Sequence, residues 1–273
     1  DITAQMTAYS YPKDVRIRSY APVRKAHSKQ ISRAATLLLA ARRPIVYTGG
    51  GVVLSGAAKQ LTTLVERLGH PCTNTLMGLG ALPSDHPRFL GMLGMHGTYE
   101  ANMAMDETDL VIALGARFDD RVTNNPSKFS PKAKIIHMDV DPASIDKIID
   151  SQIALVGDAS WVIEAIWAEY QSQVKQRPAA QSDKQSEHLS EWWQQVNGWR
   201  KEHGLNHGLK PEAGKAILPQ LAVQTLYRVT KGEAFVSSDV GQHQMFAAQY
   251  YHFDEPRRWI NSGGLGTMGF GLP

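Results

Sequence analysis

Two polar, glycine-containing stretches near the end of the chain have the residue types that bind phosphate groups. Residues 237–245 read Ser-Ser-Asp-Val-Gly-Gln-His-Gln-Met, and residues 261–273 read Asn-Ser-Gly-Gly-Leu-Gly-Thr-Met-Gly-Phe-Gly-Leu-Pro. Each follows a short apolar run that predicts a strand. A turn of small residues between a strand and a helix start gathers backbone N–H groups and a positive helix terminus, and glycine leaves room for a ligand. The pattern predicts a phosphate-containing ligand at these turns.

A glycine spacing inside the second stretch also fits the dinucleotide fingerprint G-x-G-x-x-G. The matching residues are Gly264, Gly266 and Gly269. The fingerprint should open a βαβ unit and carry an acidic residue about 20 positions later. The sequence contains four residues after Gly269. A glycine-rich loop without a ligand explains this match as well as a dinucleotide site does.

The elements that must position these residues follow an alternating pattern. Helical spacing of apolar residues predicts one helix over residues 25–42, buried through Ile31, Ala34, Ala35, Leu38 and Leu39, and a second buried through Leu61, Leu64, Val65 and Leu68. A third helix is expected from about residue 160 to residue 170. Strands are expected at 45–48, 72–76, 110–114, 134–138 and 153–156, and irregular structure at 81–100.

This alternation predicts an α/β fold with a doubly wound parallel sheet covered on both faces. Ligands of such sheets lie beyond the carboxyl ends of the strands. Four of these ends are followed by glycine or charged residues, at 49–51, 115–121, 139–142 and 157–159. A nucleotide-sized ligand is therefore expected along one edge of the sheet.

The remaining chain predicts the front part of a second α/β unit. A Gln-, Ser- and Lys-rich linker is expected from residue 171 to about residue 184, then an exposed helix at 188–203 with Trp192, Trp193, Val196 and Trp199 on one side. A helix at 219–230 and strands at 234–237 and 258–260 follow. The expected organisation is a connector at 1–24, a central domain at 25–172, a linker and helix at 173–207, and a truncated second domain at 208–273.

Composition excludes several classes of protein. The net charge of +3 is too small to indicate nucleic acid binding, and the charges are spread along the chain. Cys72 is the single cysteine, which predicts a core thiol in a reducing, cytoplasmic setting. No apolar run approaches the ~20 residues of a membrane span. The histidines are too scattered for a metal site built from protein ligands alone. Both ends resemble cuts, so we expect a fragment of a longer protein.

The two C-terminal stretches, 239–245 and 261–273, closely resemble the catalytic subunit of the acetolactate synthase (acetohydroxyacid synthase) family. Segments 49–51, 76–80, 92–98, 115–122 and 157–159 resemble the same family, so the resemblance covers most of the chain. These are thiamine diphosphate enzymes of valine, leucine and isoleucine biosynthesis. They condense two pyruvates, or pyruvate and 2-ketobutyrate, to 2-acetohydroxy acids with loss of CO2.

The resemblance implies that the central domain binds FAD as a structural cofactor. The implied flavin residues are Gly49, Gly50, Gly51, Leu93, Gly94, Met95, His96, Gly115, Ala116, Arg117, Arg121, Asp139, Val140, Gly157, Asp158 and Ala159. Their chemistry agrees, because an arginine fork pairs with phosphate and an acid after a strand accepts from a ribose hydroxyl. An exposed loop with internal ion pairs explains residues 117–121 about as well.

The resemblance also implies a thiamine diphosphate site. Val240, Gly241, Gln242 and His243 would contact this cofactor, and Gly266 and Met268 would hold its aminopyrimidine ring. The implied catalytic residues are Met268, which would force the cofactor into a bent form, and Arg121 and Gln244 near the substrate channel. The Mg²⁺ ligands would lie after Pro273 and the activating glutamate before Asp1, so residues 1–273 alone are expected to be inactive.

Two other functions stay open on the sequence. One is another thiamine diphosphate-dependent 2-ketoacid decarboxylase or carboligase. The other is a nucleotide-binding module without catalysis. The resemblance further implies a homodimer or higher oligomer, a small regulatory subunit and small 2-ketoacid substrates, with no nucleic acid or membrane partner.

Overall fold

The computed structural model describes residues 5–6, 8, 10–15, 17 and 20–272. The predicted connector at 1–24 lies partly outside these residues, and its described residues form no helix or strand. The first helix of the described residues is α1 (Ser28–Ala40).

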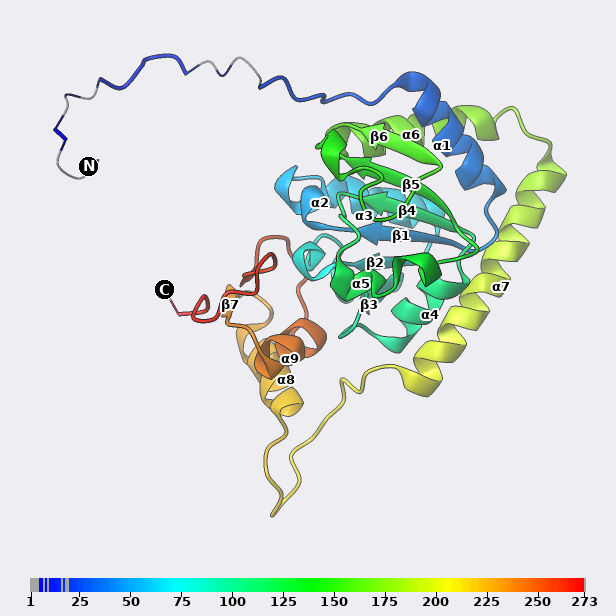
Figure 1. Ribbon diagram of the computed structural model, residues 1–273. Helices are drawn as coiled ribbons and strands as arrows, with labels where there is room; N and C mark the ends of the chain where they lie inside the picture. The colour runs from blue at the N-terminus through cyan, green and yellow to red at the C-terminus, as the bar shows by residue number, and fades with distance from the viewer. Residues whose placement is uncertain (1–4, 7, 9, 16, 18–19, 273) are drawn as a thin grey trace.

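A six-stranded parallel sheet forms the centre of the described chain (Figure 1). Its strands lie in the order β3-β2-β1-β4-β5-β6. The chain thus starts in the middle, extends the sheet to one edge through β2 and β3, and then returns to extend the other edge. The predicted doubly wound α/β sheet is confirmed. The bounds are β1 (Pro44–Thr48), β2 (Cys72–Asn74), β3 (Phe89–Met92), β4 (Leu110–Leu114), β5 (Lys134–Asp139) and β6 (Ile153–Val156).

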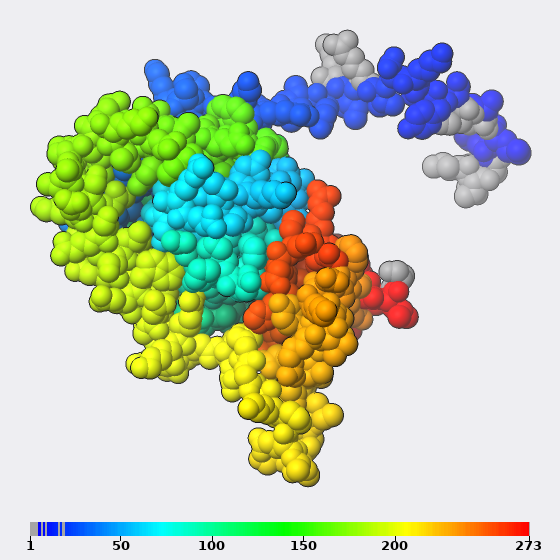
Figure 2. Space-filling view, turned by 180° about the vertical axis from the view of Figure 1, so that it is seen from behind, coloured from blue at the N-terminus to red at the C-terminus, as the bar shows by residue number. Residues whose placement is uncertain are grey.

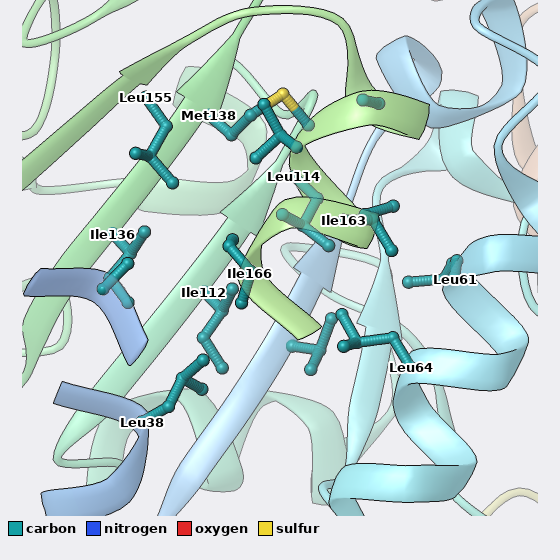
Figure 3. Close-up of a cluster of buried hydrophobic side chains, with 14 of the residues drawn as sticks. Leu38, Leu61, Leu64, Ile112, Leu114, Ile136, Met138, Leu155, Ile163 and Ile166 are labelled. Carbon is teal, nitrogen blue, oxygen red and sulfur yellow. The ribbon is translucent and has the colours of Figure 1, made fainter. Parts of the chain in front are cut away.

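Helices α1, α3 (Ala58–Leu68) and α6 (Ala159–Val174) cover one face of this sheet. Figure 3 shows Leu38 of α1 beside Ile112 of β4, and Leu61 of α3 beside Ile163 of α6, in one buried cluster. Every residue predicted to form the buried faces of the first two helices is buried. The apolar spacing was sufficient here because both helices pack on the sheet along one stripe.

Helices α4 (Tyr99–Glu107) and α7 (Ala179–His203) cover the other face. Val111 and Ala113 of β4 point to this side, since alternate residues of a strand face opposite ways. Trp192 of α7 is 1% exposed, and its Nε1–H donates to Pro44 O at 3.1 Å. Helix α7 is therefore fixed across the second face by an apolar side chain with a polar tip.

The predicted linker at 171–184 is wrong. Helix α6 continues to Val174 and α7 already begins at Ala179, with a short break at Pro178. Arg177 Nη1 donates to Leu39 O at 3.0 Å, and Gln185 Nε2 donates to Leu38 O at 3.2 Å. These long polar side chains bind the free carbonyls at the end of α1, so a composition typical of linkers is helical here.

The prediction of irregular structure at 81–100 is wrong in part, because it missed β3. The register between β2 and β3 shifts between Cys72 and Asn74, and Gly91 interrupts the strand with a φ of +89°. A short, irregular strand containing glycine lacks the apolar alternation by which strands are predicted.

The second unit contains α8 (Pro219–Thr230), β7 (Val236–Ser238), α9 (Gln242–Tyr250) and β8 (Trp259–Asn261). Strands β7 and β8 pair in parallel, and the predicted helix at 219–230 is confirmed. Phe253 and Trp259 pack with Leu79 and Met92 of the first unit. Figure 2 shows the resulting contact of the orange and red C-terminal residues with the cyan part of the first unit.

Among the described residues, no helix is long and apolar enough to cross a membrane. Cys72 is buried in the core, as predicted, and burial raises the pKa of its thiol.

His70 gives the fold a testable pH dependence. It is 2% exposed, and burial, followed by the charge of Arg88, lowers its pKa to about 3. The unfolded chain takes up this proton near pH 6.5, whereas the folded chain does not until about pH 3. Stability from His70 is therefore complete above pH 6.5 and is lost as the pH falls. The loss from pH 7 to pH 5 should be about 2 kcal/mol.

Urea unfolding of wild type and His70→Leu at pH 7, 6 and 5 measures this term. The variant should lose about 2 kcal/mol less stability than wild type over the same range, because leucine does not titrate. Equal pH slopes in the two proteins would contradict the assignment.

Candidate functional site

Many of the predicted flavin residues line one cavity at the carboxyl ends of the strands. This strand-end cavity measures about 240 Å³. Its lining includes the predicted residues Gly51, Gly115, Asp139, Val140, Gly157, Asp158 and Ala159, together with Leu54, Ser55 and Met138. The structure thus brings together residues from four separate strand ends, as expected for a parallel sheet.

Backbone contacts explain two of the glycines at this edge without any ligand. Gly51 N donates to Gly115 O at 3.1 Å, and a Cβ on Gly51 would lie 2.7 Å from Gly115 Cα. Gly115 has a φ of +61°, a conformation that costs other residues energy. The turns after β1 and β4 therefore pack backbone to backbone.

The two carboxylates at the strand-end cavity already order the local backbone. Asp139 Oδ1 accepts from Asp141 N at 2.9 Å. Asp158 Oδ1 accepts from Ser160 N at 3.0 Å and so caps the start of α6. An acid after a strand has a structural role here before any ligand is considered.

A larger cavity of about 480 Å³ lies between the two units. The first unit contributes the predicted residues Leu93, Met95, His96 and Arg121, and the second contributes Val240, Gly241, Gln244 and Gly266. Leu76, Met92, Asp119, Asp120, Val122, Met245, Ala248 and residues 262–265 complete the lining. We call this space the interunit cavity. It joins the 93–96 loop to the two C-terminal stretches, more than 100 residues later in the chain.

The loop before helix α5 (Asp120–Thr123) carries the charge of the interunit cavity. Arg117 Nη2 lies 2.9 Å from Asp119 Oδ2, so the ion pair that was the alternative explanation of this loop exists. Arg121 forms no ion pair with a described residue, and its Nη1 lies 3.6 Å from Met95 Sδ. Arg121 is therefore the cation available to a ligand of this cavity.

The two carboxylates of this loop, Asp119 and Asp120, differ in pKa. Burial, followed by the hydrogen bond with Asp120, raises the pKa of Asp119. The same hydrogen bond lowers the pKa of Asp120. Asp119 therefore takes up the first proton as the pH falls.

Asp239 joins the two C-terminal stretches. Its Oδ1 accepts from Val240 N at 2.7 Å and from Gly269 N at 2.8 Å. A Cβ on Gly271 would lie 2.5 Å from Asp239 N. Asp239 was predicted to follow a strand but was given no role; the available signal was an acidic residue directly after the strand end, at Ser238.

The turn that follows Asp239 starts helix α9. Gly241 precedes the helix with a φ of +151°, and a Cβ there would lie 3.1 Å from the His243 ring. The first backbone N–H groups of a helix have no partner inside it and attract anions. The residues after β8 form turns in the described part of the chain.

Some predicted site residues line neither cavity. Ala116 is buried, and Gly94 packs with its Cβ position 2.7 Å from Arg121 O. Met268 is 74% exposed. The complete set outside both linings is Gly49, Gly50, Gly94, Ala116, Arg117, Gln242, His243 and Met268. Their assignment to cofactors stays a prediction.

The described residues contain no candidate metal site. No three or more His, Cys, Asp or Glu side chains gather there in a way that could hold an ion.

Comparison with known families defines the class of protein. The family model of the thiamine pyrophosphate enzyme, central domain, matches residues 31–166. The model of the thiamine pyrophosphate enzyme, C-terminal TPP binding domain, matches residues 239–273. The chain belongs to the thiamine pyrophosphate enzymes.

Within this family the chain is similar to acetolactate synthase large subunits, as its motifs indicated. It is 49% identical over 270 residues to the isozyme 3 large subunit of Escherichia coli (strain K12), covering 99% of this chain and 45% of that protein. Identity is 48% over 275 residues to the large subunit of Buchnera aphidicola subsp. Schizaphis graminum, covering 100% and 46%. It is 40% over 273 residues to acetolactate synthase of Mycobacterium bovis, covering 100% and 43%. The chain spans slightly less than half the length of these relatives.

Proposed function

We propose that this chain provides the flavin domain and part of the thiamine diphosphate domain of an acetolactate synthase. The reaction would condense two 2-ketoacids with loss of CO2, in branched-chain amino acid biosynthesis. The observation that carries the proposal is the interunit cavity, because it places Arg121 and the 93–96 loop opposite the 240–244 turn. The identity of 40 to 49% to acetolactate synthases over nearly the whole chain supports the same function.

The domain division follows from this function. We assign the flavin domain to residues 25–172 and the thiamine diphosphate domain to 208–273, joined by residues 173–207. The matched family ranges, 31–166 and 239–273, fall inside these limits and support the division.

The second unit fits a diphosphate. The free N–H groups at the start of α9 suit an anion, and the Asp239 hydrogen bonds hold the 240–243 turn beside the 266–269 loop. Val240, Gly241, Gln242 and His243 would hold thiamine diphosphate with Gly266 and Met268, and Mg²⁺ would accompany the diphosphate. When bound, this cofactor stabilises the negative charge that a 2-ketoacid leaves on losing CO2.

The strand-end cavity fits a nucleotide such as FAD. Its lining combines the close-packed glycine turns with Asp139, whose carboxylate can accept from a hydroxyl. FAD would extend along the sheet edge past Arg117 and Arg121 toward residues 93–96. In the interunit cavity, the Arg121 guanidinium would bind the substrate carboxylate, and the Gln244 amide would orient it.

Assembly and location complete the proposal. Two of the relatives are named large subunits, so we infer a smaller partner subunit for this chain as well. A homodimer or higher oligomer in the cytoplasm is the state in which we expect it to act.

A product assay on the native enzyme that contains this chain tests the function. With pyruvate, thiamine diphosphate, Mg²⁺ and FAD, acetolactate should form, and removal of thiamine diphosphate or of FAD should abolish it. Acetaldehyde as the main product would indicate the alternative 2-ketoacid decarboxylase. Saturable FAD binding without turnover of any 2-ketoacid would indicate the non-catalytic nucleotide-binding module.

A further inference from the structure

One row of side chains crosses three strands under the loop that carries Arg121. Tyr47 of β1 pairs in register with Ala113 of β4, and Ala113 pairs with His137 of β5. All three are buried on the face covered by α4 and α7. The rings of Tyr47 and His137 therefore flank the methyl group of Ala113.

The ring of Phe118 lies over this row. Its centroid is 4.9 Å from the His137 ring, 5.7 Å from the Tyr47 ring and 5.8 Å from the Phe129 ring. Phe118 is 1% exposed although both of its neighbours, Arg117 and Asp119, reach solvent. One aromatic side chain thus fixes an otherwise charged loop to the sheet.

The backbone at Phe118 indicates that this contact outweighs a local cost. Its φ is +54°, a conformation unfavourable for a bulky residue. Burial of a phenylalanine side chain is favourable enough to offset backbone strain of this kind. The turn points the ring inward and the two charged neighbours outward.

His137 holds the same loop by a hydrogen bond. Its Nε2 lies 2.9 Å from Ala116 O, and a carbonyl only accepts, so Nε2 carries the hydrogen. Burial lowers the pKa of His137, which keeps the ring neutral. The imidazole is therefore a fixed donor to the residue two positions before Phe118.

Backbone hydrogen bonds connect this loop directly to residues that line the interunit cavity. Asp119 O accepts from Val122 N at 2.9 Å, and Arg121 O accepts from Met95 N at 2.9 Å. A shift at Phe118 would therefore move both Arg121 and the 93–96 loop.

We propose that Phe118 and His137 are positioning residues that hold residues 115–122 so that Arg121 faces the substrate space. The inference rests on the proposed function and deepens it. Neither side chain lines the interunit cavity, so both act through Arg121.

Five variants of the native enzyme test this role. Phe118→Gly removes the ring, and glycine adopts the positive φ without strain. A change in this variant is therefore caused by the missing ring and not by backbone strain. His137→Gln keeps a donor at the position of Nε2, whereas His137→Leu and His137→Asn do not. Ile45→Ala is the matched control, because Ile45 is fully buried on the same face but lies at the opposite end of β1 from the loop.

The first readout is KM and kcat for pyruvate with saturating cofactors, beside the melting temperature. Phe118→Gly, His137→Leu and His137→Asn should raise KM about tenfold or more, since misplacement by about 1 Å can cost 10²-fold. His137→Gln should stay within about threefold of wild type. Ile45→Ala should lower the melting temperature with KM unchanged. If the Phe118 and His137 variants behave like Ile45→Ala, the positioning role is wrong.

The second readout does not require activity. Limited trypsin digestion followed by mass spectrometry measures cleavage after Arg117 and Arg121. Cleavage should accelerate about tenfold in Phe118→Gly and His137→Leu, relative to Ile45→Ala and His137→Gln. If the wild type is inactive but the variants show this cleavage pattern, the proposed function is wrong and the loop restraint still holds. If all variants are cleaved equally fast, the loop restraint is wrong.

Discussion

Replacing Asp239 with alanine is expected to weaken thiamine diphosphate binding about 10- to 100-fold. One carboxylate oxygen accepts from both Val240 N and Gly269 N, so a single truncation separates the two C-terminal stretches. A hydrogen bond to a charged group contributes about 1.5–3 kcal/mol, and 1.4 kcal/mol is a tenfold change in affinity. A titration of the native enzyme with thiamine diphosphate, at fixed Mg²⁺, measures the effect.

Asp239→Asn is the matched control, because the amide oxygen at the same position can still accept from both N–H groups. It should retain affinity to within about tenfold of wild type. If Asp239→Ala binds the cofactor as tightly as wild type, the contact between the two stretches does not organise the site.

Replacing Gly115 with alanine is expected to cost about 2–5 kcal/mol of unfolding free energy. The positive φ accounts for about 1–2 kcal/mol and overpacking for a further 1–3 kcal/mol. The new methyl group would lie 2.7 Å from Gly51 Cα and 2.9 Å from Val52 N. These are backbone atoms, so no side chain can rotate away to make room. The midpoint of urea unfolding gives the loss if the slope is unchanged.

Gly56→Ala separates the two contributions. Gly56 has a similar φ of +71°, but a Cβ there would meet nothing within 4 Å. The Gly56→Ala variant should lose about 1–2 kcal/mol of unfolding free energy, from the backbone conformation alone. Equal losses at Gly115 and Gly56 would mean that the turns after β1 and β4 can move apart, and the strand-end cavity would then lack a rigid wall.

The sheet and its first face were predictable because they depend on local patterns. The five residues assigned to the buried side of α1 lie on one helical stripe, and all are buried. The strand-end residues followed from one rule, that carboxyl ends of parallel strands meet at one edge. Such rules need only the order of elements along the chain.

The missed features depend on contacts distant in sequence. Arg177, in the break between α6 and α7, and Gln185 of α7 both bind free carbonyls at the end of α1, more than 130 residues earlier. The interunit cavity requires the second unit to pack on Met92 and Leu79, and no spacing within either unit predicts that contact. The burial of Phe118 was not predicted from its charged loop, because this burial depends on a register across three strands.

The position of α7 in the chain has a consequence during synthesis. Trp192 bonds to Pro44, 148 residues earlier, and covers a face of the sheet whose last strand ends at Val156. A ribosome adds about 5–20 residues per second, so the finished strands precede Trp192 by about 2–7 s. During that interval Val111 and Ala113 have no α7 over them. The nascent chain therefore passes through a state in which this side of its sheet is covered by α4 but not yet by α7.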